Sequence, residues 1–280
     1  MCIVFININV TTTGTTVEEI GIKLTNDCQV VSQWMQGNTL KLNADKTHLM
    51  TVGTSRSLQR QEDSLTVYMD NCRLGESEDK CETLLGCQIE PGLKWHKQVS
   101  QLIIKLKKRL TALEKLRNVK PQRVRKKITQ GVFTSVLVYC LPVFGGLDKN
   151  EIQSLQVMQN KAARIVTHSG LRVPRREIFN QLRWLTVNQV IFYYSALTIF
   201  RIRECKEPEY LNQWLSRDND RGNIVVENTR LSLAKTSFCF RSSAQWNRIP
   251  TSIRNSAKIG IFKQKLKDWI LINIEQFLDP

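Results

Sequence analysis

The sequence has no long apolar run. None of its hydrophobic stretches reaches the roughly 20 residues that a helix needs to cross a bilayer, so we expect no membrane partner. The opening residues 1–10 are apolar, but Asn7 and Asn9 interrupt them, and they carry neither a basic start nor a small-residue cleavage site. We therefore expect no signal peptide.

Closely spaced cysteines and histidines are also missing. Eight cysteines scattered over 280 residues lack the density of a disulfide-stapled secreted domain. Cys72, Cys81 and Cys87 have eight and five residues between them, without a Cys-x2-Cys pair or a nearby histidine, so the sequence predicts no metal site. The 3 histidines lie far apart and near no nucleophile pattern, which argues against a hydrolase triad. We expect an intracellular protein, in the nucleus or the cytoplasm.

Acidic residues are scarce relative to basic ones. The balance of 41 Lys and Arg against 25 Asp and Glu gives a formal charge of +16, which is typical of proteins that bind polyanions. No carboxylate precedes Glu18. With 41% hydrophobic residues the chain can bury a sizeable core, in one large domain or two small ones.

The sequence of residues 1–92 predicts one helix packed on a small antiparallel sheet. Thr16 and Glu19 form a Thr-x-x-Glu capping pattern, and apolar residues follow at helical spacing to Trp34. Short apolar stretches separated by turn residues, among them Gly75-Glu-Ser, are typical of strands. The predicted strands cover 49–52, 65–69 and 83–89, and Pro91-Gly92 ends the region.

From Leu93 onward the periodicity becomes helical. An apolar stripe is formed by Val99, Leu102, Leu106, Leu110, Leu113 and Leu116. Further helices are predicted over 121–139, with Pro121 at the first helical position, over 151–167, and over 259–277. The sequence therefore predicts an α+β protein with three parts: the small sheet region at 1–92, a basic helical region at 93–168 and a second helical region at 169–280.

Basic residues crowd the segment 94–127, where Glu114 is the only acid. At about 100° per residue, Lys108 and Lys115 project opposite the leucine stripe, so one helix can bury an apolar face and present cations on the other. Such a face suits phosphates, whose neutralisation releases counterions; the alternative is a merely solvated helix face. The predicted nucleic-acid-binding residues are Lys97, Lys105, Lys107, Lys108, Arg109, Lys115, Arg123, Arg125, Lys126 and Lys127.

Four sequence blocks resemble one family. Residues 34–50, WMQGNTLKLNADKTHLM, are similar to the W…N-x-L-x-L-N-x-x-K-T-x-x-M palm block of LINE-type (non-LTR retrotransposon) reverse transcriptases. Residues 85–95 resemble the element that follows near the end of the palm. Residues 155–165, LQVMQNKAARI, and the pair WNRIP at 246–250 with FKQKLK at 262–267 resemble blocks of the family's carboxyl-terminal region. In order and spacing these blocks span nearly the whole chain.

The resemblance implies the end of a reverse-transcriptase palm, a helical thumb and a carboxyl-terminal helical region that hold an RNA–DNA primer-template. It places Lys46 near the leaving pyrophosphate. The family's aromatic-x-Asp-Asp hairpin corresponds to Phe5-Ile6-Asn7-Ile8-Asn9 here, and an amide has no charge with which to concentrate Mg²⁺. We therefore expect no catalytic carboxylate, no cofactor and no polymerisation by this chain alone, because Mg²⁺ would serve only a complete polymerase.

Three alternatives remain at this point. The fingers and the earlier palm aspartate would precede Met1, so a truncated or decayed copy of a mobile element is expected, and a complete reverse transcriptase in trans would have to complement it. A helical scaffold that binds a protein partner is the second alternative. The third is a relic without function, whose open strand edges would favour aggregation.

Overall fold

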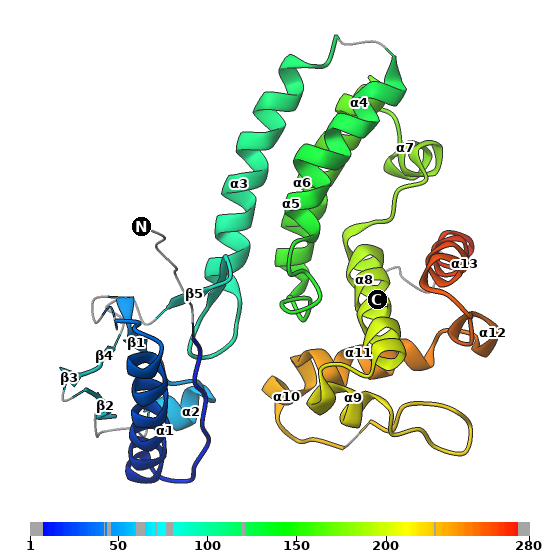
Figure 1. Ribbon diagram of the computed structural model, residues 1–280. Coiled ribbons are helices and arrows are strands. Elements are labelled where there is room, and N and C mark those ends of the chain that lie inside the picture. The colour runs from blue at the N-terminus through cyan, green and yellow to red at the C-terminus, as the bar shows by residue number, and fades with distance from the viewer. Residues whose placement is uncertain are drawn as a thin grey trace. The chain divides into compact units, whose positions relative to one another are not determined.

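The computed structural model describes residues 8–41, 43, 46–59, 65–70, 72–76, 81–118, 121–226 and 228–273 (Figure 1). The chain divides into two compact units, Met1–Lys94 and Trp95–Pro280, whereas the sequence predicted a boundary near Gly92. Across the described ranges, none of the helices has both the length and the apolar character of a membrane span.

The first unit begins with the predicted helix, α1 (Val17–Gly37). The Thr16 hydroxyl accepts a hydrogen bond of 3.2 Å from the Glu19 amide, which satisfies one of the unpaired amides of the first turn. The Glu19 carboxylate accepts from the amide and the hydroxyl of Thr15, both at 2.9 Å, and pairs with Lys23 at 2.6 Å. The capping prediction is confirmed, and the helix continues three residues beyond Trp34.

Strands in this unit are short and pair two by two. β1 (His48–Leu49) lies parallel to β4 (Gly75–Glu76), whereas β2 (Tyr68–Met69) pairs antiparallel with β3 (Cys72–Arg73). β5 (Glu82–Leu84) and β6 (Cys87–Ile89) form an antiparallel hairpin, and a short helix, α2 (Ser55–Gln59), follows β1. The prediction of an antiparallel sheet is therefore wrong for β1 and β4. Gly75 was predicted to lie in a turn, but it begins β4, which pairs parallel with β1.

The prediction of one strand over 83–89 is wrong. Leu85 and Gly86 both have positive φ angles, of 49° and 79°. Positive φ at both central residues is what a two-residue hairpin turn with the natural strand twist requires. The apolar run therefore folds back on itself, and Leu85 lies exposed at the turn.

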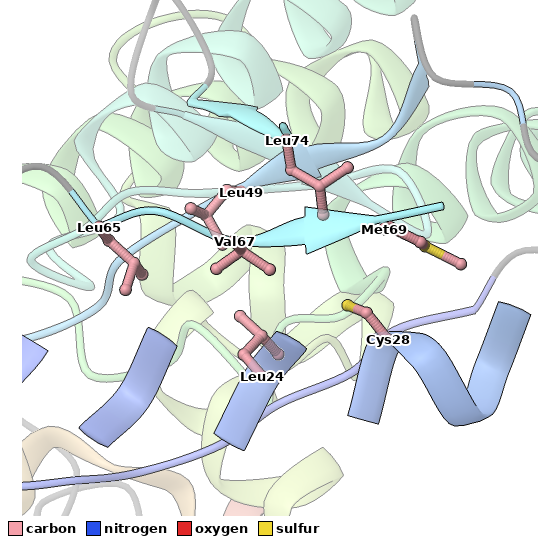
Figure 2. Close-up of a cluster of buried hydrophobic side chains, with 7 residues drawn as sticks. All are labelled: Leu24, Cys28, Leu49, Leu65, Val67, Met69 and Leu74. Atoms are coloured by element: carbon pink, nitrogen blue, oxygen red, sulfur yellow. The ribbon is translucent and has the colours of Figure 1, made fainter. Parts of the chain in front are cut away.

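A compact apolar cluster joins α1 to the strands. Figure 2 shows Leu24 and Cys28 of α1 directed toward Val67 and Met69. Leu49, Leu65 and Leu74 complete the buried set. The predicted packing of this helix on strands is thus confirmed. The short helix α2 was not predicted, and the described strands form three separate pairs and not one sheet.

The elements described in the second unit are helices, and one isolated antiparallel bridge joins Asp218 to Ile224. Figure 1 shows α3, α4 and α6 side by side, and α6 packs against both α3 and α4. α8 packs on α6, and α9, α11 and α13 pack on α8. The elements are α3 (His96–Lys115), α4 (Gln122–Thr129), the π-helical turn η2 (Gln130–Thr134), α5 (Ser135–Val138), α6 (Lys149–Thr167), α7 (Arg175–Leu182), α8 (Val187–Cys205), α9 (Glu209–Leu215), α10 (Ser232–Thr236), α11 (Phe238–Asn247), α12 (Thr251–Arg254) and α13 (Ile259–Ile272).

Several helix limits differ from the predicted ones. α3 begins at His96 and not at Leu93, because Leu93 and Trp95 have positive φ angles of 49° and 65°, outside the helical region. Pro121 is the N-cap of α4 and not its first helical residue, and the predicted 121–139 helix contains η2. α13 is described to Ile272, and residues 274–277 of its predicted range lie outside the described residues.

The described structure is therefore of the α+β class and mostly helical, as predicted. The leucine stripe of α3 is buried from Val99 to Leu113, and Leu116 is partly buried. The second unit contains both predicted helical regions, and their division at residue 168 stays a prediction.

Candidate nucleic-acid interface

The outer side of α3 carries a dense group of exposed cations. Leu106, in the middle of the buried stripe, has no exposed surface, and burial of that stripe leaves the remaining faces of the helix to solvent. Glu114, the one acid of this helix, pairs with Arg117 at 2.8 Å. The exposed cations, which we call the α3 basic face, are Lys97, Lys105, Lys107, Lys108, Arg109 and Lys115.

On α4 the predicted binding residues separate into two pairs. Arg123 and Lys127 are exposed and lie four residues apart, so they share a face of the helix. Arg125 is buried, and its Nε donates to the carbonyl oxygen of Val166 at 3.0 Å. Lys126 is half-buried, and its Nζ donates to the carbonyl oxygen of Leu182 at 2.8 Å.

Arg125 and Lys126 thereby donate hydrogen bonds to carbonyl groups at the carboxyl ends of two other helices. Val166 lies in the last turn of α6 and Leu182 is the last residue of α7. Carbonyls in a last helical turn lack partners within their own helix, and cations there also complement the helix dipole. Composition could not distinguish these two cations from their neighbours, because a charge in a sequence does not show what it meets after folding.

Residues from three positions meet where α3 and α6 begin. His96 Nδ1 lies 2.7 Å from Glu151 Oε1, and Asp148 and Glu151 form a capping box on α6, each bonding the other's backbone amide. Within the described ranges, His96, Asp148 and Glu151 form the group that could hold a metal ion, because one nitrogen or oxygen atom of each lies within 4.8 Å of the others. The carboxylates of Asp148 and Glu151 both cap α6, and Glu151 also contacts His96. We therefore interpret the group as a contact that holds the start of α3 against the start of α6.

Lys46, the predicted palm lysine, lies in the first unit. Its side chain is exposed, and its amide donates to the Asn43 carbonyl at 3.1 Å, two residues before β1. The first three residues of the Phe5–Asn9 segment, where the metal-binding hairpin was expected, lie outside the described residues. The role of Lys46 near a pyrophosphate stays a prediction.

Residues of the family-like blocks in the second unit have structural partners. Gln156 Oε1 accepts from the Val187 amide at 2.9 Å, and Gln159 Nε2 donates to the Leu185 carbonyl at 2.9 Å. Both glutamines are buried on α6, so they hold the start of α8 against it. Buried amides need such partners, because an unsatisfied polar group costs about 1–3 kcal/mol.

Residues of the carboxyl-terminal block at 246–250 and 262–267 also make contacts that hold the fold together. Trp246 packs on Phe262 with ring centroids 5.8 Å apart, and Asn247 bonds both the amide and the carbonyl of Ile224 at 2.9 Å. Arg203 lies over the Trp246 ring and pairs with Asp218 through two hydrogen bonds of 2.9 and 2.6 Å. These contacts hold the polar loop around Asp218 against α8 and α11.

Comparisons of this chain with protein-family models, with curated proteins and with solved structures found no match. The likeness to LINE-type reverse transcriptases consequently rests on the sequence blocks alone.

Proposed function

We propose that this protein binds nucleic acid through backbone phosphates, using the α3 basic face together with Arg123 and Lys127 of α4. The observation that carries the proposal is the concentration of exposed cations on one well-packed helix whose only acid is already paired. A 20-residue helix is about 30 Å long, which is enough to follow several phosphates of one strand.

Side-chain directions set how many phosphates can be contacted at once. Lys97, Lys108 and Lys115 project opposite the buried stripe, and Lys105 and Lys107 project to its two sides. A single strand would therefore meet about three to five of these cations. The expected slope of log affinity against log salt is then about −2 to −4.5.

The finer proposal follows from the resemblance. The first unit would correspond to the end of a reverse-transcriptase palm and α3 to α6 to a thumb, so the ligand would be an RNA–DNA primer-template of a mobile element. We propose that these 280 residues, tested on their own, do not act as an RNA-directed DNA polymerase. Primer extension in the presence of Mg²⁺ and deoxynucleotides, above a mock preparation, would refute that part.

The test of binding compares two variants that remove the same charge. One changes Lys105, Lys107, Lys108 and Arg109 to Gln; the control changes four exposed cations elsewhere in the unit, Arg201, Lys206, Arg221 and Lys235, to Gln. Fluorescence anisotropy with a labelled RNA–DNA primer-template measures affinity at several salt concentrations. The proposal expects loss of affinity in the first variant and near-parental binding in the control.

Exposed apolar residues favour a second candidate function, binding to a protein partner. Ile22, Val30 and Trp34 of α1 keep 64%, 66% and 49% of their surface exposed. They project within about 120° of one another around the helix, and exposed apolar groups of this kind can mark interaction sites. Binding through α1 would depend weakly on salt, and Val30→Asp with Trp34→Ala would abolish it.

A further inference from the structure

A second group of cations lies where hydrogen bonds link α4, the end of α7 and α13. Lys126 of α4 donates to the carbonyl of Leu182, the last residue of α7. The next residue, Arg183, donates to Asp268 of α13 at 2.6 Å. Lys267 immediately precedes Asp268. Two hydrogen bonds thus bring cations from three separate segments together, and we call Lys126, Arg183 and Lys267 the cationic triad.

Positive charge in the triad exceeds the negative charge that balances it. Asp268 is already paired with Arg183. The pKa of Lys267 is lowered first by burial of its half-buried side chain and then by the positive charges of Lys126 and Arg183, against which Asp268 acts in the opposite direction. Like charges held close together destabilise one another's charged forms, so an anion bound here would relieve repulsion already present in the folded protein.

We propose that the cationic triad binds one backbone phosphate of the nucleic acid held by the α3 basic face. A phosphodiester offers two oxygen acceptors and one negative charge, which suits a guanidinium and an ammonium converging from different elements. Lys126 is followed directly by Lys127, whose exposed side chain belongs to the proposed binding surface. The inference rests on the proposed function and extends its contacts to α13, where Lys267 comes 141 positions after Lys126 of α4 in the sequence.

Lys267→Gln is the central variant, and Lys265→Gln is its matched control. Lys265 is exposed and lies on the same helix, about 160° around the axis from Lys267, so its removal changes the same charge on another face. Lys267→Arg keeps the cation. Thermal unfolding of each variant comes first; we expect Lys267→Gln to be at least as stable as the parent at low salt, because it removes a repelled, half-buried charge.

Binding of the full chain to the labelled primer-template then decides the matter. We expect Lys267→Gln to lower affinity about threefold to tenfold and to make the salt slope shallower by about one, with parental behaviour in Lys265→Gln and Lys267→Arg. Parental affinity in Lys267→Gln, while the α3 variant loses binding, would overturn the triad and leave the proposed function standing. Parental affinity in the α3 variant would overturn the proposed function itself.

A short oligonucleotide tests phosphate binding at the cationic triad separately from binding at the α3 basic face. The trinucleotide dT3 has too few phosphates to span the α3 basic face, and the pKa of Lys267 can be followed by NMR of its side-chain carbons. Binding should raise that pKa toward its ordinary value, because the phosphate offsets Lys126 and Arg183. An unchanged Lys267 pKa at saturating dT3 would contradict phosphate binding by the triad.

Discussion

Arg125 donates a hydrogen bond of 3.0 Å from its Nε to the carbonyl oxygen of Val166, inside the second unit. Its neighbour two residues on, Lys127, is exposed on the same helix. Two cations of one basic run therefore have different tasks, one in the fold and one on the surface. The difference between them can be measured.

We predict that Arg125→Met lowers the free energy of unfolding by about 1–3 kcal/mol, because it leaves a buried carbonyl without this donor. Lys127→Met should change stability by less than about 0.5 kcal/mol, since its side chain is exposed. Chemical denaturation measures both. Equal effects of the two substitutions would contradict the separation of roles on α4.

The core beneath the basic face gives a second prediction. Leu106 has no exposed surface, so Leu106→Ala should cost about 2–5 kcal/mol of unfolding free energy through lost burial and a residual cavity. Ile104, on the opposite side of α3 and 46% exposed, is the control. Its replacement by Ala should cost less than about 1 kcal/mol. Comparable losses at both positions would mean that α3 does not bury the predicted face.

A third prediction concerns pH and α1. The pKa of Glu19 is lowered from 4.5 to about 2, first by the hydrogen bond from Lys23 and then by those from Thr15. A carboxyl whose folded pKa is depressed stabilises the fold above its unfolded value and loses that contribution as pH falls toward the folded one. Protection of the α1 amides against hydrogen exchange should therefore decrease between about pH 4.5 and 2.

Glu19→Gln tests this assignment. The variant cannot titrate at this position, so the part of the pH dependence that arises from Glu19 should vanish from α1. Glu18, exposed in the same turn, supplies the control substitution Glu18→Gln, which should keep the parental pH profile. An identical acid response in parent and Glu19→Gln would show that other groups control the start of this helix.

Features with local signals were predictable from the sequence. The Thr16 cap, the leucine stripe of α3 and the α6 helix all depend on residues within a few turns of one another, and the structure confirms them. The hairpin at Leu85–Gly86 was missed because its only signal is a single glycine in an apolar run. The start of α3 was misplaced because a positive φ at Trp95 has no signature in the side chain.

The candidate site was predictable only in part, and for a related reason. Net charge and periodicity indicate that cations gather on α3, but they do not show which cations of α4 face other helices. Arg183 and Lys267 were not predicted as binding residues, since Arg183 is an ordinary basic residue directly after α7 and Lys267 was noted only as part of the block at 262–267. Their relation to Lys126 exists only through the contacts of α7 and α13.

The measurement that tests the central claim most directly is the affinity of the full chain for an RNA–DNA primer-template as a function of salt. The account predicts a log–log slope of about −2 to −4.5, made shallower by changing Lys105, Lys107, Lys108 and Arg109 to Gln and unchanged in the charge-matched control. Binding that is independent of salt, or a slope that the two variants reduce equally, would contradict a phosphate-binding surface on α3.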